Sequence, residues 1–301
     1  MARYLETTLN DWKDIFNIDQ LFLYPFIFRG QCCCEWELRT YIERESCLYD
    51  IKNYFFTEKS MIQEFRNNFH LYSNLRFEPN DLCEILATMQ HHYAPTRLMD
   101  FTKSIFISSY FAVLNSITDS AIWALNKQLL KEEFKHQFKL DYDLVFDSDI
   151  KINNLCKNKI NEILNVENQD FSIPSTVIPL NSTFCTERLA RQQGLFLFPT
   201  NTGITFRDNL NVAFKNKDNF VRIEMEELIQ LSKNETPNEI GIIKIIIPIE
   251  KKDEILYHLK KMNITSELLF PGLDGLCLSL LHKVMASKHL INGYLRNENE
   301  I

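Results

Sequence analysis

The sequence predicts a mixed α/β fold, in which a single domain has a central mixed sheet flanked by helices. Two observations support this prediction. Hydrophobic patterns typical of helices and of strands interleave irregularly along the 301 residues, and no internal repeat or low-complexity linker divides them. The composition, 45% hydrophobic and 24% charged, is that of an ordinary globular protein with room for a sizeable core.

The N-terminal region is expected to contain one helix and then one strand. Residues 1–20 are predicted to form a helical extension, with Trp12, Ile15 and Phe16 on one face. The apolar run that follows, residues 21–28, is rich in strand-forming residues and is predicted to be a buried strand. The domain proper is therefore expected to span residues 21–290.

The remaining elements are predicted from periodicity and from capping residues. Asp81, followed three residues later by Glu84, is a good helix N-cap, and Gly194 is a typical residue just after a helix end. Helices are expected over 58–71, 82–91, 103–115, 186–193, 252–262 and 274–288. Strands are expected over 121–125, 175–179, 195–198 and 241–247. Residues 127–170 are interpreted as a helical insertion, and residues 291–301 as a polar tail.

Charge and hydropathy exclude several classes of protein. The net charge, −7 from 33 basic and 40 acidic residues, argues against non-specific binding to nucleic acid or to a membrane surface. Residues 1–6 contain no apolar signal region, and the apolar, uncharged stretch at residues 104–118 is too short to cross a bilayer. We therefore expect a soluble, cytoplasmic protein with no membrane partner.

The eight cysteines predict no metal site. None are spaced as C-x-x-C and no histidine pair completes a zinc pattern, so most are expected to be reduced and buried. Cys32, Cys33 and Cys34 are adjacent, and the sequence assigns them no role. Walker A, G-x-G-x-x-G, H-E-x-x-H and G-x-S-x-G motifs do not occur in the sequence, which argues against the commonest nucleotide hydrolases, dehydrogenases, metalloproteases and esterases.

The triplet Phe28-Arg29-Gly30 lies where the first predicted strand ends. A buried arginine must face an anion, backbone carbonyls or solvent, and glycine allows a sharp turn or the close approach of a ligand. Arg29 and Gly30 are therefore candidates for phosphate binding. The alternative is a strand-end arginine that pairs with a surface carboxylate.

A second cluster, residues 90–100, concentrates polar side chains around a helix end and a proline turn. Gln90, His91, Thr96, Arg97 and Asp100 must satisfy one another or a ligand, because an unpaired buried polar group costs about 1–3 kcal/mol. The alternative is a structural network, in which Arg97 pairs with Asp100 and His91 is a satisfied core histidine.

Two later segments supply further candidates. Arg188 and Gln192 are four residues apart, so they share a helix face that either lines a site or is simply solvated. Glu267 precedes an apolar segment, where it is either a catalytic carboxylate or an ordinary surface residue.

Together and in order, these segments resemble the FRG domain family. The family's Phe/Tyr-Arg-Gly motif corresponds to residues 28–31, followed by Trp36, Leu38 and Arg44. Its signature Gln-His-Tyr-Gly-Leu-Pro-Thr-Arg-Leu-Leu-Asp is matched at Gln90, His91, Pro95, Thr96, Arg97, Leu98 and Asp100, and the Tyr110-Phe111-Ala112 helix also fits. Its later elements resemble Arg188, Gln192, Gly194, Phe196 and residues 269–275. The chain departs from the signature at His92 and Tyr93, where the family has Tyr-Gly, and the missing glycine bears on the geometry of this turn.

A weaker resemblance, to ADP-ribosyltransferases, implies an activity. Those enzymes often carry an aromatic-Arg-Gly on a strand, where the arginine holds the pyrophosphate or ribose of NAD. The resemblance implies that Arg29 grips the phosphates and that Gly30 leaves room for the dinucleotide. It also requires a carboxylate, for which Glu267 and Asp100 are the candidates.

The resemblance implies further roles at the same site. His91, Thr96 and Arg97 would line the nicotinamide-ribose side with Gln90, and Asp100 would orient Arg97. Arg188 and Gln192 would line the pocket, and Gln192 would close it.

Three hypotheses remain open on the sequence. The first is an enzyme that uses NAD as a substrate and transfers ADP-ribose to a macromolecular acceptor, as a toxin or phage-defence effector would by analogy of fold. The second is a non-catalytic module that binds a nucleotide or a protein through the same cleft. The third is a hydrolase or nuclease that uses the His91/Asp100 pair, which the lack of a metal pattern and the negative charge argue against.

Overall fold

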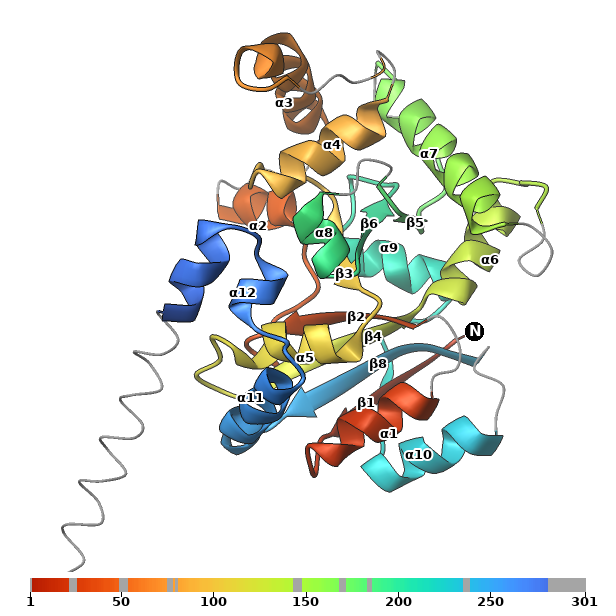
Figure 1. Ribbon diagram of the computed structural model, residues 1–301. Helices are drawn as coiled ribbons and strands as arrows, with labels where there is room; N and C mark the ends of the chain where they lie inside the picture. Colours follow the sequence, from red (N-terminus) through yellow and green to blue (C-terminus); the bar gives the residue numbers. More distant parts are fainter. Residues whose placement is uncertain are drawn as a thin grey trace, which may run out of the picture.

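An eight-stranded mixed sheet runs through the molecule (Figure 1), in the order β5-β6-β3-β2-β4-β8-β1-β7. The computed structural model describes residues 2–21, 26–48, 54–74, 78, 81–142, 148–167, 172–182, 186–234 and 239–280. The strands are β1 (Arg3–Thr8), β2 (Phe26–Gln31), β3 (Met99–Thr102), β4 (Ser120–Asn126), β5 (Val177–Leu180), β6 (Gly194–Pro199), β7 (Phe220–Arg222) and β8 (Ile240–Ile247). β1 pairs in parallel with β7 and β8, whereas the other neighbouring strands pair antiparallel.

One face of the sheet carries two separate groups of helices. The first group is α1 (Lys13–Leu21), α5 (Ile105–Val113), α10 (Met225–Asn234) and α11 (Lys252–Lys261), which pack on β1, β2, β4 and β8. The second group is α3 (Phe55–Asn68), α4 (Leu82–His91) and α7 (Asp149–Asn165), which pack on β5 and β6. Each group has its own apolar core, and the two cores meet the same side of the sheet at different strands.

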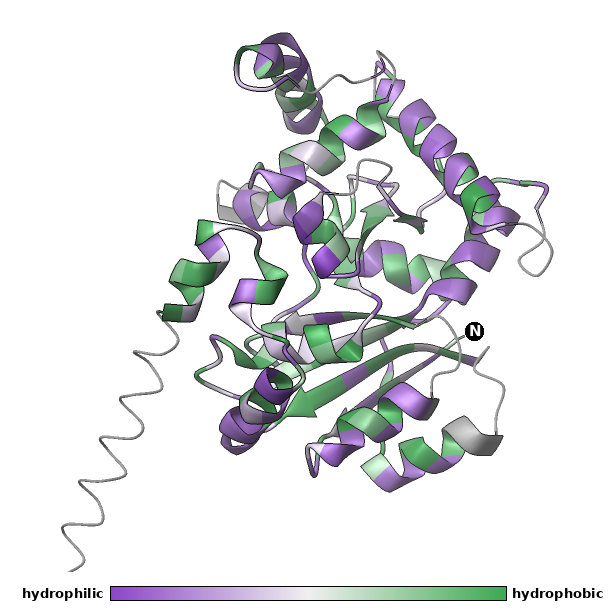
Figure 2. Cartoon of the chain, in the orientation of Figure 1, coloured by the Kyte–Doolittle hydropathy of each residue, from purple (hydrophilic) through white to green (hydrophobic). Residues whose placement is uncertain are grey.

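The opposite face has a core of its own. Because side chains alternate along a strand, Phe28 contributes to the first core while its neighbour Ile27 points to the other face. There α6 (Lys127–Gln137) and α9 (Phe206–Ala213) cover the sheet with residues such as Leu130 and Phe206. Figure 2 shows the resulting pattern, with apolar residues along the strands and on the inner faces of the helices.

The predicted mixed α/β fold, with a central mixed sheet flanked by helices, is confirmed. Most predicted helices occur where expected, and α4 begins with Asp81 as its N-cap, whose side chain accepts a hydrogen bond from the backbone of Glu84. The insertion over 127–170 contains α6 and α7. Residues 274–280 of the predicted last helix are helical, whereas the rest of that helix and the tail at 291–301 lie outside the described residues.

The predicted helical extension over residues 1–20 is wrong for its first part. Arg3–Thr8 forms β1, which lies inside the sheet between β8 and β7, so this segment belongs to the domain itself. Tyr4 and Leu5 are fully buried because both faces of the strand are covered. Its partners come from residues more than two hundred positions later, a relationship that a local hydrophobic pattern does not contain.

Two smaller predictions also need correction. The strand predicted over 21–28 starts later, because Leu21 still belongs to α1 and β2 begins at Phe26; residues 22–25 lie outside the described residues. Gly194 does not follow the helix end in a left-handed conformation. Gln193 adopts that conformation, with φ 47°, and Gly194 opens β6. A side chain at Gly194 would collide with Leu189, since its Cβ would lie 2.4 Å from the Leu189 Cδ1 atom.

Several elements had no counterpart among the predictions. They are α2 (Tyr41–Leu48), β3, α9, β7, α10 and α12 (Ser266–Leu269). The helix predicted over 186–193 is present as the shorter α8 (Glu187–Arg191). Within the part of the chain that the structure describes, every helix is too short or too polar to reach across a bilayer.

Candidate functional site

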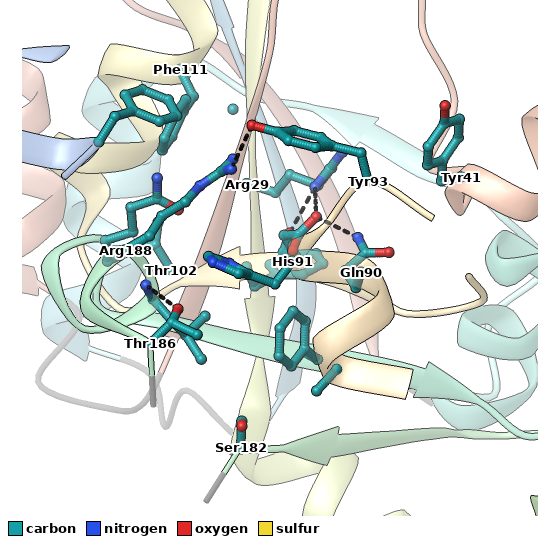
Figure 3. Close-up of a pocket in the computed structure, with 18 of the residues that line it drawn as sticks. Arg29, Tyr41, Gln90, His91, Tyr93, Thr102, Phe111, Ser182, Thr186 and Arg188 are labelled. Atoms are coloured by element: carbon teal, nitrogen blue, oxygen red, sulfur yellow. Dashed lines mark hydrogen bonds and ion pairs between the residues drawn. The ribbon is translucent and has the colours of Figure 1, made fainter. Parts of the chain in front are cut away.

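A cavity of about 670 Å³ opens on the sheet face between the two helix groups (Figure 3). This volume falls in the range of about 300–1,000 Å³ that is usual for small-molecule sites. Its walls come from β2, β3, α2, α4, α5 and α8 and from the segment after α12. The lining side chains that carry charge or hydrogen-bonding groups include Arg29, Tyr41, Arg44, Gln90, His91, Tyr93, Asp100, Thr102, Thr186, Arg188 and Gln192.

The floor of the cavity is a gap between two neighbouring strands. β2 and β3 share a single residue pair, Phe28 with Thr102, beyond which the ladder ends. Arg29 follows directly on β2, and its Nη1 atom donates a hydrogen bond to the backbone carbonyl oxygen of Asp100 on β3, at 2.8 Å. The guanidinium therefore takes the place of the missing backbone hydrogen bonds and holds the two strands at the gap.

Arg29 keeps unused hydrogen-bonding capacity at this position. Its side chain is 19% exposed, and Nη1 lies 3.9 Å from the Asp100 Oδ2 atom, which is a weak ion pair. The Nε atom is buried and has no hydrogen-bond partner among the described residues. Burial lowers the pKa of Arg29, with Asp100 opposing that effect, but an arginine stays charged in a protein. A charged, incompletely paired guanidinium in a cavity favours an anionic ligand.

Glycine is required at position 30 for a structural reason that differs from the predicted turn or ligand contact. A Cβ atom at this position would lie 2.0 Å from the Ser108 carbonyl oxygen and 2.5 Å from the Ala112 nitrogen, both in α5. The space beside Gly30 is thus filled by the backbone of α5, although the residue also borders the cavity. The glycine allows α5 to pack closely on β2, and this packing places the wall of the cavity.

Asp100 is held by a short chain of hydrogen bonds from the end of α4. Gln90 Nε2 donates to Asp100 Oδ2 at 2.9 Å, and Thr96 Oγ1 donates to Gln90 Oε1 at 2.6 Å. Thr96 is fully buried and does not line the cavity, so it acts on the site through Gln90. The Asp100 side chain remains 57% exposed, and its carboxylate faces the cavity.

Arg97 lies outside the cavity, contrary to the prediction, and does not pair with Asp100. Its guanidinium forms a buried ion pair with Glu58 of α3, in which Nε donates to Glu58 Oε2 at 2.6 Å. Burial alone lowers the pKa of Arg97, but the Glu58 carboxylate outweighs it and raises the pKa above the usual value. Arg97 therefore ties β3 to α3. The partner was not recognisable in sequence, because Glu58 lies 39 residues away in a helix with many charged residues.

His91 borders the cavity as predicted. Its ring centroid lies 5.0 Å from that of His92 in an edge-to-face arrangement. Burial lowers the pKa of His91, and the electrostatic effects of the neighbouring His92 and Arg188 lower it further, with Asp100 opposing them. The imidazole is consequently neutral at pH 7 and is able to accept a proton.

Arg188 spans the opposite wall. Its Nη1 donates to the Tyr93 hydroxyl at 3.0 Å, and its guanidinium lies 5.0 Å from the centre of the Phe270 ring. Figure 3 shows the Tyr93 ring reaching across toward Arg188. Gln192, on the same helical turn, donates from Nε2 to the backbone oxygen of Leu269 at 3.1 Å. This bond joins the end of α8 to the last residue of α12.

Glu267, predicted as a candidate catalytic carboxylate, lies outside the cavity wall. Its Oε1 atom accepts a hydrogen bond from the Ser279 hydroxyl at 2.6 Å. Its backbone oxygen accepts from Arg191 at 3.3 Å. Glu267 thus connects α12 to the following helix, and Asp100 is left as the carboxylate of the cavity wall among the described residues.

The charge of the cavity is opposite to that of the whole chain. Three arginines, Arg29, Arg44 and Arg188, line it together with one carboxylate, that of Asp100. The whole chain carries a net charge of −7. A positive cavity in a negative protein concentrates anions from solution. Within the described ranges, no three His, Cys, Asp or Glu side chains are grouped so that they could hold a metal ion.

Sequence reasoning missed some of the lining residues. Tyr93 was noted only as a departure from a motif, and Arg44 and Phe111 only as motif positions, yet all three border the cavity. Tyr41 and Thr186 had no signal, because each reaches the cavity through an element whose position depends on the packing of the whole sheet. Cys32 also borders the cavity, and its thiol donates to the Phe111 carbonyl oxygen at 3.5 Å.

Comparison with known families gives one match. The FRG domain matches residues 24–121, which contain β2, α2, α3, α4, β3 and α5. That region supplies Arg29, Arg44, His91 and Asp100, whereas Arg188 comes from outside it. Searches of curated proteins and of solved structures gave no match.

Proposed function

This chain carries an FRG domain, and from that premise we propose that it binds NAD in the cavity and transfers ADP-ribose to a macromolecular acceptor. The observation that carries the proposal is the arginine-lined cavity over the β2–β3 gap, with Arg29 held by the Asp100 carbonyl. A planar guanidinium fixed on a strand suits the two phosphates of a dinucleotide. The aromatic side chains of the wall suit its two rings.

The proposed reaction breaks the bond between the ribose C1′ and the nicotinamide nitrogen. Nicotinamide leaves with the bonding electron pair, and a nucleophilic oxygen or nitrogen of the acceptor forms the new bond to C1′. The Asp100 carboxylate stabilises the positive charge that develops on the ribose. Neutral His91 takes the proton that the acceptor loses. The acceptor is proposed to be a macromolecule, in the manner of a toxin or a phage-defence effector.

Asp100 takes the catalytic role here because Glu267 lies outside the cavity wall. Gln90 orients the carboxylate by its 2.9 Å hydrogen bond, and Thr96 orients Gln90 in turn. These two residues are positioning residues in the proposal. Preorganised charge of this kind accounts for about 10²–10³ in rate at well-studied sites.

The same network favours a second candidate function. The Asp100 carboxylate already accepts from Gln90 and lies near Arg29, so its charge is partly compensated before any ligand enters. A cavity in which the charge of the carboxylate is already compensated by neighbouring side chains is suited to binding a nucleotide without catalysing transfer of ADP-ribose. The alternative is therefore a non-catalytic module that binds a nucleotide at the same cavity.

Label transfer separates the two candidates. The purified chain is incubated with NAD labelled in its adenylate part and with cell lysate, in parallel with Arg29→Ala and Asp100→Asn. Arg222→Ala serves as the matched control, because Arg222 is an exposed arginine on β7 whose ion-pair contact among the described residues is a distant one, to Glu6 at 3.9 Å. We expect transfer by the unmodified chain and by the control, and a loss of about 10²-fold or more in the two cavity variants.

Two other outcomes decide against the enzyme. Saturable NAD binding without label transfer supports the binding module. The absence of NAD binding by the unmodified chain contradicts both candidates.

A further inference from the structure

Tyr93 has a backbone conformation that is unfavourable for tyrosine. Its φ is 64°, in the left-handed region that glycine adopts readily and that bulky residues rarely adopt. The turn is fixed by hydrogen bonds from the Tyr93 nitrogen to the Gln90 oxygen and from the Ala94 nitrogen to the Met89 oxygen. It is also the position at which the FRG signature has glycine. The turn geometry is therefore kept, and a tyrosine occupies it at a conformational cost.

Burial of the ring does not offset that cost. Tyr93 is 69% exposed, although it lines the cavity. Its ring is held from one side by Arg188, through the 3.0 Å hydrogen bond to its hydroxyl and through the guanidinium, which lies 5.4 Å from the ring centre. The other aromatic residue at that wall, Phe270, is partly buried and is already covered by the same guanidinium.

An exposed, fixed aromatic ring beside a positively charged cavity is suited to stacking on the base of a nucleotide. Every nucleobase has a flat π face that stacks on a tyrosine ring, and such stacking does not require a particular sequence of hydrogen bonds. The arginines of the cavity bind phosphate but are indifferent to what the phosphate carries. The Tyr93 ring lies among the side chains that line the cavity (Figure 3). A ring in this place adds selectivity for ligands that carry an aromatic base.

We propose that Tyr93 is the stacking platform for an aromatic base of the ligand and that it makes this cavity selective for nucleotides over base-free phosphates. The proposal deepens the function proposed above and rests on it. Arg188 is a positioning residue in this arrangement, because its hydrogen bond fixes the ring across the mouth of the cavity. Tyr93 thereby has a role at a position where the family signature has no side chain.

The test compares two probes, NAD and inorganic pyrophosphate, by titration calorimetry on the full chain. Tyr93→Gly removes the ring and suits the left-handed backbone, so it should fold. Tyr93→Phe keeps the ring and removes the hydroxyl. Tyr72→Gly is the matched control, because Tyr72 is 87% exposed and lies outside the cavity.

We expect Tyr93→Gly to bind NAD about tenfold or more weakly than the unmodified chain, since base stacking is worth about 1–3 kcal/mol. Its binding of pyrophosphate should be unchanged. Tyr93→Phe should restore most of the lost NAD affinity, and Tyr72→Gly should bind both probes as the unmodified chain does.

Equal NAD affinity in Tyr93→Gly and the unmodified chain overturns the stacking proposal and leaves the proposed function intact. An equal loss of NAD and pyrophosphate binding in Tyr93→Gly also overturns it, because the ring would then act through Arg188 and not on the base. Failure of the unmodified chain to bind NAD overturns the proposed function itself.

Discussion

The Nη1 atom of Arg29 donates a hydrogen bond to the backbone oxygen of Asp100 across the gap between β2 and β3, at 2.8 Å. This contact joins two of the sequence clusters that carry the FRG resemblance, 71 residues apart, at the floor of one cavity. It also leaves the buried Nε of Arg29 without a partner among the described residues. The strand gap, the arginine and the cavity are thus one structural feature.

Replacing Gly30 should destabilise the fold. In Gly30→Ala the new Cβ would lie 2.0 Å from the Ser108 oxygen, so the backbone of α5 or β2 must shift, at about 3 kcal/mol or more of unfolding free energy. Urea denaturation measures the change. Gly272→Ala is the matched control, because nothing lies within 4 Å of its Cβ position and only its φ of 76° opposes alanine, at about 1 kcal/mol. If Gly30→Ala is no less stable than Gly272→Ala, the close packing of α5 on β2 is wrong.

Neutralising Glu58 should leave an unpaired buried charge. Arg97 and Glu58 are 2% and 1% exposed, so Glu58→Gln should lower the free energy of unfolding by about 3 kcal/mol or more. Glu64→Gln, on the exposed side of the same helix, should change it by less than about 0.5 kcal/mol. Thermal and urea denaturation compare the two variants. Equal stability of Glu58→Gln and the unmodified chain would mean that this ion pair does not hold α3 in place.

His91 should titrate below its ordinary pKa of 6.5, because burial and the nearby His92 and Arg188 favour the neutral ring. In the window between 6.5 and the lower folded-state pKa, the unfolded chain binds more protons than the folded one. The stability contribution of His91 is therefore complete above 6.5 and is lost as the pH falls through that window.

Nuclear magnetic resonance of the His91 ring protons, identified by their disappearance in His91→Asn, measures this titration. An anion bound in the cavity should raise the pKa of His91, because it favours the charged ring. A titration midpoint at or above 6.5 in the free protein contradicts the environment that the structure gives to His91.

Tyr93 should show the cost of its backbone conformation directly. Tyr93→Gly and Tyr93→Ala both lack the ring and differ only in a Cβ atom at φ 64°, so the glycine variant should be more stable by about 1 kcal/mol. At Tyr72, where φ is −116°, the glycine variant should be no more stable than the alanine variant, or less stable. The free energies of unfolding of the four variants test this. An alanine at position 93 as stable as glycine would remove the premise that the turn needs a glycine-like backbone.

Local patterns predicted the elements that depend on their own residues. The N-cap at Asp81 and the apolar faces of α3, α4 and α5 are decided within a few turns of the chain, so the sequence predicted these helices closely. β1 was missed because its burial depends on β7 and β8, far away in sequence. The same limit explains why α9 and β7 had no prediction.

The candidate site, like the fold, was predicted in part. Motif resemblance brought Arg29, Gln90, His91, Asp100, Arg188 and Gln192 to one cavity, as expected. It failed for Arg97, because a motif lists residues without saying which face of an element they use. Glu267 belongs to no motif and was a candidate only because the proposed reaction requires a carboxylate; it lies outside the cavity wall. Arg97 points to Glu58, and Glu267 to Ser279, for reasons of packing that only the assembled fold contains.

Calorimetric titration of NAD into the full chain measures whether the guanidinium of Arg29 binds the phosphates of the dinucleotide. The matched variants are Arg29→Lys, which keeps the charge but loses the planar fork, and the exposed Arg222→Lys. We expect saturable binding by the unmodified chain and by Arg222→Lys, and an affinity about tenfold or more lower in Arg29→Lys. If Arg29→Lys binds NAD as tightly as the unmodified chain does, the planar fork of Arg29 does not hold the phosphates.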